Sequence, residues 1–308
     1  MVADGVGLSV RIEGLVEHQI RVGIVAPYFV SGNDGDEVHY RPVGKGFICQ
    51  VNPMRDPSRR GLRDEGKRGC FLCEANMPDD EEGIELCEGW KIYPNPRPYE
   101  RNHVVLVRTR GRDHHPFQII DEREQIAMAV ETIRRIGYDE GRNRFNLTFN
   151  SVFAAASSRH LHFQIFECDL PIEQYPVKHF RKDAVTYGVV KDYPASVLVI
   201  EGDDTLALSS AIWDAVDNFN THCASFIPYV ILMKVIDGRV RAYLFPRVSE
   251  NPAESKPGLI DVKFGVCEMS GMVIVYSDEM ADQISERQYT ESLRVVSDRD
   301  VLSYLYGI

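Results

Sequence analysis

The sequence contains no dense run of lysine or arginine, and its acidic residues outnumber its basic ones. The 308 residues include 46 Asp and Glu against 35 Lys and Arg, which gives a formal net charge of −11. A large non-specific nucleic-acid footprint requires a basic face. The composition therefore argues against a nucleic-acid partner, although it is compatible with a small anionic ligand held in a local basic pocket.

Long apolar runs and clustered cysteines are also missing. No segment approaches the length of a membrane span, and the first residues, MVADGVGLSVRIEG, include an acid and lack a signal-peptide core. The seven cysteines are scattered, except for Cys70 and Cys73. This distribution is typical of a reducing compartment, with a metal or redox role for a close pair. We therefore expect a cytoplasmic protein without a membrane partner.

Local patterns predict both helices and strands. Apolar residues at helical spacing predict a helix that ends near Gly137, with a stripe formed by Ile126, Ala129, Val130 and Ile133. The segment TLALSSAIWDAVDNFNTH, residues 205–222, predicts another helix. Two β-rich runs around Asp237-Gly238 predict a hairpin over residues 228–246.

The order of these patterns indicates two mixed halves. We expect an α+β protein divided into residues 1–180 and 181–308, with the first 45 residues as a peripheral lead-in. The segment EQYPVKHFRKD, residues 173–183, is expected to be the hinge between the halves. The 44% hydrophobic content is enough for a sizeable core.

The segment SSRHLHFQIF, residues 157–166, places polar side chains on alternate positions of an apolar run. In a strand, His160, His162 and Gln164 would share one face with Phe166, and the other face would be apolar. A single buried histidine is usually a hydrogen-bonded core residue. Burying three aligned polar groups without partners would cost a few kcal/mol each. They are therefore expected to face a polar cavity, a metal or a ligand.

This histidine strand resembles the active-site strand of the histidine triad superfamily, in the transferase branch that has Gln in place of a third His. That branch includes galactose-1-phosphate uridylyltransferases, diadenosine tetraphosphate phosphorylases and GDP-L-galactose phosphorylases. Similarity is greatest to the last family, through FICQVNPMRDPSRR, YPASVLVIEG, PYVILMKVIDGRVRAYLFPR and VCEMSGMVIV in the same order, and it extends from about residue 46 to 275. The resemblance implies two tandem histidine-triad-like halves, with antiparallel sheets flanked by helices, of which the first is catalytic.

The resemblance also implies a chemistry for the strand. His162 would attack the α-phosphorus of an NDP-sugar, most of all a GDP-hexose, and the nucleotidyl group would then pass to phosphate or a sugar phosphate. The residues support this, since neutral imidazole is a competent nucleophile. Gln164 can donate a hydrogen bond to phosphoryl oxygens but cannot supply a proton, which suits a phosphate leaving group.

Further ligand contacts are implied by order and spacing. The substrate-binding candidates are Asn150, Ser157, Ser158, Arg55, Arg59, Arg60 and Lys178. Each has an alternative interpretation as a sheet-edge amide, an ordinary loop serine or a solvated basic residue.

The cysteine pair is half of a zinc site, and it is also compatible with a redox pair or two unremarkable thiols. GCFLCEAN resembles the Cys-x-x-Cys segment of galactose-1-phosphate uridylyltransferases. That likeness implies a zinc ion, or iron in its place, bound by Cys70, Cys73, His160 and either His115 or His114. Two thiolates and two imidazoles form a closed tetrahedral set.

Two other interpretations of the function are compatible with the sequence. One is a hexose-1-phosphate uridylyltransferase or a dinucleoside polyphosphate phosphorylase. The other is a sugar-nucleotide-binding protein that reuses the fold without transfer. A homodimer is a further expectation from the resemblance.

Overall fold

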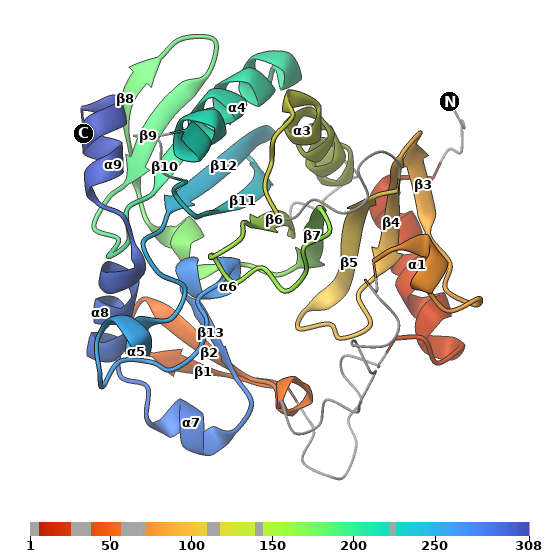
Figure 1. The fold of residues 1–308 in the computed structure, drawn as a ribbon, viewed down its shortest axis with the longest axis horizontal. Helices are drawn as coiled ribbons and strands as arrows, with labels where there is room; N and C mark the ends of the chain where they lie inside the picture. The colour runs from red at the N-terminus through yellow and green to blue at the C-terminus, as the bar shows by residue number, and fades with distance from the viewer. Residues whose placement is uncertain are drawn as a thin grey trace.

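A ten-stranded antiparallel sheet forms the centre of the protein (Figure 1). The computed structural model describes residues 6–25, 38–56, 70, 72–109, 118–138, 144–221 and 226–307. The strand order is β3-β4-β5-β7-β6-β11-β12-β10-β9-β8. These strands are β3 (Ile84–Cys87), β4 (Trp90–Pro94), β5 (Arg101–Arg108), β6 (Phe145–Asn150), β7 (His162–Glu167), β8 (Val177–Lys182), β9 (Thr186–Val190), β10 (Leu198–Gly202), β11 (Tyr229–Ile236) and β12 (Arg239–Pro246).

The sheet consists of two halves with the same topology. Strands β3, β4 and β5 are followed by helix α3 (Arg123–Tyr138) and then by β6 and β7, while β8, β9 and β10 are followed by α4 (Thr205–Thr221) and then by β11 and β12. The halves join where β6 pairs antiparallel with β11, with Thr148 opposite Leu232 at the centre of the ladder. One polypeptide therefore builds a pseudo-twofold arrangement, with five strands from each half.

One face of the large sheet is covered by helices. Helices α1 (Leu8–Arg21), α3, α4 and α9 (Asp300–Tyr306) pack there on an apolar cluster that includes Leu161, Phe163 and Ile165 of the histidine segment. The three side chains are buried because they alternate toward this face along the chain. The apolar side of the histidine strand is thus confirmed as core.

A smaller sheet and several short helices cover the other face. The small sheet contains β1 (His39–Val43), β2 (Phe47–Val51) and β13 (Met272–Val275), with β2 antiparallel to β1 and parallel to β13. Its core includes Phe166, from the same side of β7 as His162 and Gln164. The remaining elements are η1 (Pro53–Arg55), η3 (Glu74–Asn76), η4 (Pro171–Gln174), α5 (Pro252–Ser255), α6 (Val266–Met269), α7 (Asp278–Asp282) and α8 (Glu286–Val296).

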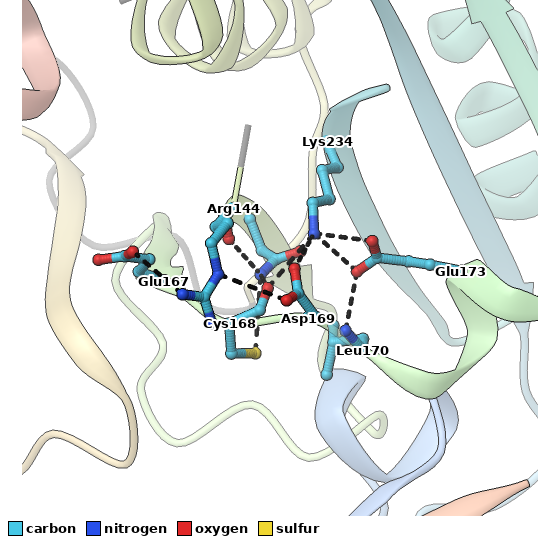
Figure 2. A network of polar contacts seen from close by, with 8 residues as sticks. Arg144, Glu167, Cys168, Asp169, Leu170, Glu173 and Lys234 are labelled. Carbon is cyan, nitrogen blue, oxygen red and sulfur yellow. Dashed lines mark hydrogen bonds and ion pairs between the residues drawn. The ribbon is translucent and has the colours of Figure 1, made fainter. Parts of the chain in front are cut away.

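A buried ion-pair network holds the segment that links the two halves (Figure 2). Lys234 on β11 is only 3% exposed, and its Nζ donates to both carboxylate oxygens of Glu173, at 2.9 and 2.7 Å. It also lies 3.3 Å from Oδ1 of Asp169 and donates to the carbonyl of Cys168 at 3.4 Å. The linker after β7 is therefore tied to β11, the strand of the second half that pairs with the first half.

The structure confirms the α+β class and differs from two expectations. The expected lead-in contains α1, whose Leu8 and Ile12 are buried in the core. The expected hinge over residues 173–183 contains β8, which pairs with β9. Strand β8 was not predicted because an exposed edge strand rich in charged residues has a weak apolar alternation. The division into residues 1–180 and 181–308 stays a prediction, and residue 180 lies within β8. Within the described residues, no helix has both the length and the apolar character needed to cross a membrane.

Candidate active site and metal centre

His162 is the first residue of β7 and lies opposite Val107 of β5. Its Nδ1 atom is 2.8 Å from the carbonyl oxygen of His160. A carbonyl oxygen only accepts hydrogen bonds, so Nδ1 carries the proton and Nε2 keeps its lone pair. Burial lowers the pKa of His162 to about 4, which leaves the ring neutral near pH 7. The imidazole therefore has the tautomer that a nucleophilic Nε2 requires.

Gln118 holds the main chain of His162. Its Nε2 donates to the carbonyl of His162 at 2.7 Å, and its Oε1 accepts from the His162 amide at 3.2 Å. The Gln118 side chain thus continues the hydrogen-bond ladder on the side where pairing of β6 with β7 ends at Thr148 and Gln164. It is 1% exposed. This clamp fixes the start of the strand that carries the histidine.

Gln164 lies two residues further on the same face of β7, opposite Val105. Its Oε1 is 3.2 Å from the Tyr99 hydroxyl and 3.1 Å from Nε2 of His103. Within the described part of the chain, the Gln164 Nε2 atom has no hydrogen-bond partner. The amide hydrogens are therefore available to a ligand.

Cys70, Cys73 and His160 form the metal-binding candidate. One ligand atom from each lies within 4.8 Å of the other two. Nδ1 of His160 is 3.6 Å from Sγ of Cys70 and 3.5 Å from Sγ of Cys73, while its Nε2 donates to the carbonyl of Arg108 at 2.8 Å. The Nε2 bond leaves the Nδ1 lone pair directed at the thiols, as in metal sites where a second hydrogen bond fixes the tautomer. These donors fit a tetrahedral zinc ion with one further ligand.

The environment of Cys70 favours metal binding. Burial alone would raise its pKa, but the neighbouring His160 side chain, a hydrogen bond from the Leu72 amide and the contact with the Ser158 hydroxyl lower the pKa of Cys70 to about 7. A thiolate is the form that binds metal. The two histidine residues predicted as alternate fourth ligands, His114 and His115, lie outside the described residues.

Three of the predicted substrate-binding residues lie at the end of β6 and in the loop that follows it. Asn150 accepts a hydrogen bond from the amide of Val266 through Oδ1, at 3.0 Å. Ser158 Oγ accepts from the His160 amide at 3.1 Å. Ser157 is exposed and lines a cavity of about 260 Å³ together with Gln118. The remaining lining residues are Val152, Phe153, Ala156, Ser158 and Arg159. The cavity therefore adjoins the main-chain clamp of His162.

The predicted basic residues are distributed differently. Arg55 lies beside the site, with its guanidinium 5.5 Å from the centre of the Tyr99 ring and 3.4 Å from the carbonyl of Arg97. Lys178 lies on β8, at the opposite end of the large sheet, with five strands between it and β7. It is therefore not brought to the histidine strand. Arg59 and Arg60 lie outside the described residues.

The second half has no histidine at the corresponding position. Counting outward from the central Thr148–Leu232 pair, Gln164 corresponds to Tyr243, and His162 corresponds to Arg241. Nε of Arg241 donates to Oε2 of Glu201 at 2.7 Å. An internal ion pair therefore stands where the first half has its imidazole.

Two protein families match the chain, one in each half. Residues 44–167 match a domain family of unknown function, DUF4922, and residues 171–300 match the family described as GDPGP1-like, C-terminal domain. The two matches meet between β7 and β8, at the linker held by Lys234.

One curated relative and two solved structures are similar to the chain across both halves. The chain is 29% identical to GDP-L-galactose phosphorylase 2 of Arabidopsis thaliana, over 86% of this chain and 58% of the relative, so it spans less than two thirds of that protein. Yeast Ap4A phosphorylase Apa2 has the same fold, with a TM-score of 0.67, 15% identity and coverage of 94% of this chain and 97% of the other. Its complex with Ap4A gives a TM-score of 0.65 at the same identity and coverage. The curated relative confirms the resemblance to GDP-L-galactose phosphorylases, and the solved structures show the shared fold.

Three residues of the site were missed by sequence reasoning. Gln118 lies between the β5 strand and α3, in a segment without periodicity, and neither His103 nor Tyr99 belongs to a motif. Each acts through a contact with β7 that depends on tertiary structure. The only available signal was that His103 opens the apolar segment HVVLVRT, where a polar residue is unexpected.

Proposed function

We propose that this chain transfers a nucleotidyl group from an NDP-sugar, specifically a GDP-hexose, to phosphate or a sugar phosphate. The observation that carries the proposal is the Nδ1–H tautomer of His162, fixed at 2.8 Å from a carbonyl. It leaves the Nε2 lone pair as the nucleophile. The GDP-hexose assignment is supported by the likeness to GDP-L-galactose phosphorylase 2.

The reaction has two half-reactions. Nε2 of His162 attacks the α-phosphorus, an N–P bond forms, and the P–O bond to the sugar 1-phosphate breaks. The leaving group departs as a phosphate ester that needs no protonation. This agrees with Gln164, which stands where a general acid could act but cannot supply a proton. Phosphate then attacks the nucleotidyl-histidine, the N–P bond breaks, and a nucleoside diphosphate is released. Alternating half-reactions of this kind give ping-pong kinetics.

The neighbouring residues support this chemistry. The Gln164 amide hydrogens can bind a phosphoryl oxygen, and the Arg55 guanidinium beside Tyr99 supplies positive charge. A zinc ion bound by Cys70, Cys73, His160 and a fourth ligand such as His115 or His114 would link the segment with the two cysteines to the start of β7. The metal would thereby act structurally. The catalytic site belongs to the first half, since Arg241 replaces the histidine in the second.

Intact-mass measurement tests the proposal directly. The protein is incubated without phosphate with GDP-, UDP- and ADP-hexoses and with Ap4A, and the covalent adduct is weighed. We expect addition of one GMP, its absence in His162→Ala, and release of GDP when phosphate is added. Addition of UMP or AMP would assign the chain to one of the alternative transferases. Tight binding of a sugar nucleotide without any adduct would overturn the proposal.

A further inference from the structure

A buried histidine of β5 lies directly behind the Gln164 side chain. His103 is 1% exposed, and its ring lies 4.1 Å from the ring of Tyr99, centre to centre. The register between β5 and β7 shifts between Arg101 and Val104. This bulge contains Asn102, whose φ is 51° and whose Nδ2 donates to Glu167 at 3.0 Å. Bulges re-aim side chains beside functional sites, and this one includes His103.

The protonation of the His103 ring follows from its neighbours. Its Nδ1 is 3.3 Å from the Tyr99 amide nitrogen, which can only donate, so Nδ1 is the acceptor. Neutral imidazole keeps one proton, which must therefore be on Nε2. Nε2 has two near neighbours, Nδ2 of Asn95 at 3.0 Å and Oε1 of Gln164 at 3.1 Å. Asn95 Oδ1 accepts from the amide of Arg97, so the Asn95 NH2 group faces Nε2 as a second donor and is not its hydrogen-bond partner. Only Gln164 therefore presents an acceptor to Nε2–H.

These contacts determine which end of the Gln164 amide faces the ligand. Its Oε1 accepts from two donors, Nε2–H of His103 and the Tyr99 hydroxyl, at 3.1 and 3.2 Å. A flipped amide would place its NH2 group against both donors. The flipped amide would also turn its oxygen toward the phosphoryl oxygens, which repel it.

We propose that His103 and Tyr99 are positioning residues that lock the Gln164 amide with its NH2 group toward the phosphoryl group of the substrate. The inference rests on the proposed function and deepens it. Together they favour a substrate whose phosphoryl oxygens are unprotonated and accept a hydrogen bond from Gln164. Its leaving group must depart without a proton from an acid. Neither residue touches the substrate, since each acts through Gln164.

A double-mutant cycle separates this role from a merely structural one. The rate of covalent nucleotidyl-enzyme formation is measured in single turnover for wild type, His103→Leu, Gln164→Ala and the double variant. We expect His103→Leu to slow labelling about 10- to 100-fold, because a preorganised donor is lost. In the Gln164→Ala background the same change should have no further effect. Equal slowing in both backgrounds would overturn the inference, since a structural defect acts whether or not Gln164 is present.

Two further variants protect the test against a folding failure. Tyr99→Phe keeps the ring and removes one donor, and we expect a loss of rate about 10-fold that also vanishes in Gln164→Ala. Tyr193→Phe is the matched control, because its buried hydroxyl donates to the carbonyl of Met269, away from Gln164. His103→Gln retains an N–H donor and should restore part of the rate lost in His103→Leu. Full activity in both Tyr99→Phe and His103→Leu would refute the inference.

A measurement without substrate distinguishes failure of this inference from failure of the proposed function. Histidine labelled with 15N is observed by NMR, and the His103 signals are assigned by their loss in His103→Gln. We expect an Nε2–H tautomer. A protonated Nδ1 would refute the orientation argument even if the enzyme is active. An Nε2–H tautomer in a protein that no nucleotide labels would leave the amide orientation supported while refuting transfer.

Discussion

Nδ1 of His162 lies 2.8 Å from the main-chain carbonyl of His160, two residues earlier on the same segment. The orienting group of the imidazole is therefore part of the backbone. Histidine nucleophiles and bases commonly need a second group that fixes their tautomer. Here the strand itself supplies it, so the proposed chemistry depends on how firmly residues 160–162 are held. Gln118 and the Cys70–Cys73–His160 cluster hold them from two sides.

Replacing Gln118 should impair labelling of His162 without removing any reacting group. Gln118→Ala leaves the buried N–H and C=O of His162 without their side-chain partner, at a cost of about 1–3 kcal/mol. If half or more of that free energy is lost from the positioning of the His162 ring in the transition state, nucleotidyl transfer should slow about 10-fold. The measurement is the single-turnover rate of adduct formation.

Gln125→Ala is the control for this variant. Gln125 is equally buried, and its side chain is bonded to Asp121 at the start of α3. It should lose comparable stability and keep the labelling rate. Equal rates in the two variants would show that Gln118 does not position His162.

Removal of one thiol should remove the metal. We expect purified wild-type protein to carry about one zinc per chain by elemental analysis, and Cys73→Ser to carry far less. The variant should also melt at a lower temperature, because structural zinc contributes to folding. Cys87→Ser, at an exposed cysteine on β3, should change neither quantity. Wild-type protein without bound metal after zinc-supplemented expression would contradict the site.

Lys234, which lies outside the candidate site, should contribute strongly to the free energy of unfolding. Lys234→Met leaves the Glu173 carboxylate without its buried cation, and removal of one partner of such a pair destabilises by about 3 kcal/mol. Chemical unfolding measures the difference. The double variant Lys234→Met, Glu173→Gln should recover part of the loss, because no uncompensated charge remains. Lys256→Met, which removes an exposed pair with Glu291, should leave the unfolding midpoint unchanged.

His103 should make stability depend on pH in the acid range. Burial lowers the pKa of His103 to about 3, against about 6.5 in the unfolded chain. Below pH 6.5 the unfolded state therefore binds a proton that the folded state does not, and stability falls as the pH falls. Between pH 7 and 5 this residue should cost about 2 kcal/mol of unfolding free energy.

His103→Gln should lack that contribution. Its unfolding free energy should decline less than that of wild type over the same interval, by about 2 kcal/mol. Urea unfolding at a series of pH values provides the comparison, and parallel curves would show that His103 titrates normally in the folded protein.

The elements predicted correctly are those determined by local sequence. The apolar stripe of α3 is fully buried, α4 covers the predicted range, and the predicted hairpin is β11 and β12. Its turn residues Asp237 and Gly238 have φ values of 51° and 74°, the backbone that a tight hairpin requires. In each case the apolar spacing or the turn residues can be read within one continuous segment.

The parts that were not predicted depend on distant segments. The pairing of β2 with β13 joins residues from the two ends of the described chain. β8 has no apolar alternation, because it is an exposed edge strand, and only its pairing with β9 identifies it. In the site, His162, Gln164 and the cysteine pair carry a recognisable pattern, whereas Gln118 and His103 gain their roles only when the chain folds.

The β1–β2–β13 sheet connects the two halves of the chain, so the halves cannot be separated without breaking it. β1 and β2 belong to the first half by sequence, yet β13 comes after the whole second half. Splitting the gene at the linker would separate strands that complete each other's hydrogen bonds. The two products would have to associate before either could complete its hydrophobic core, so we expect neither half to fold alone.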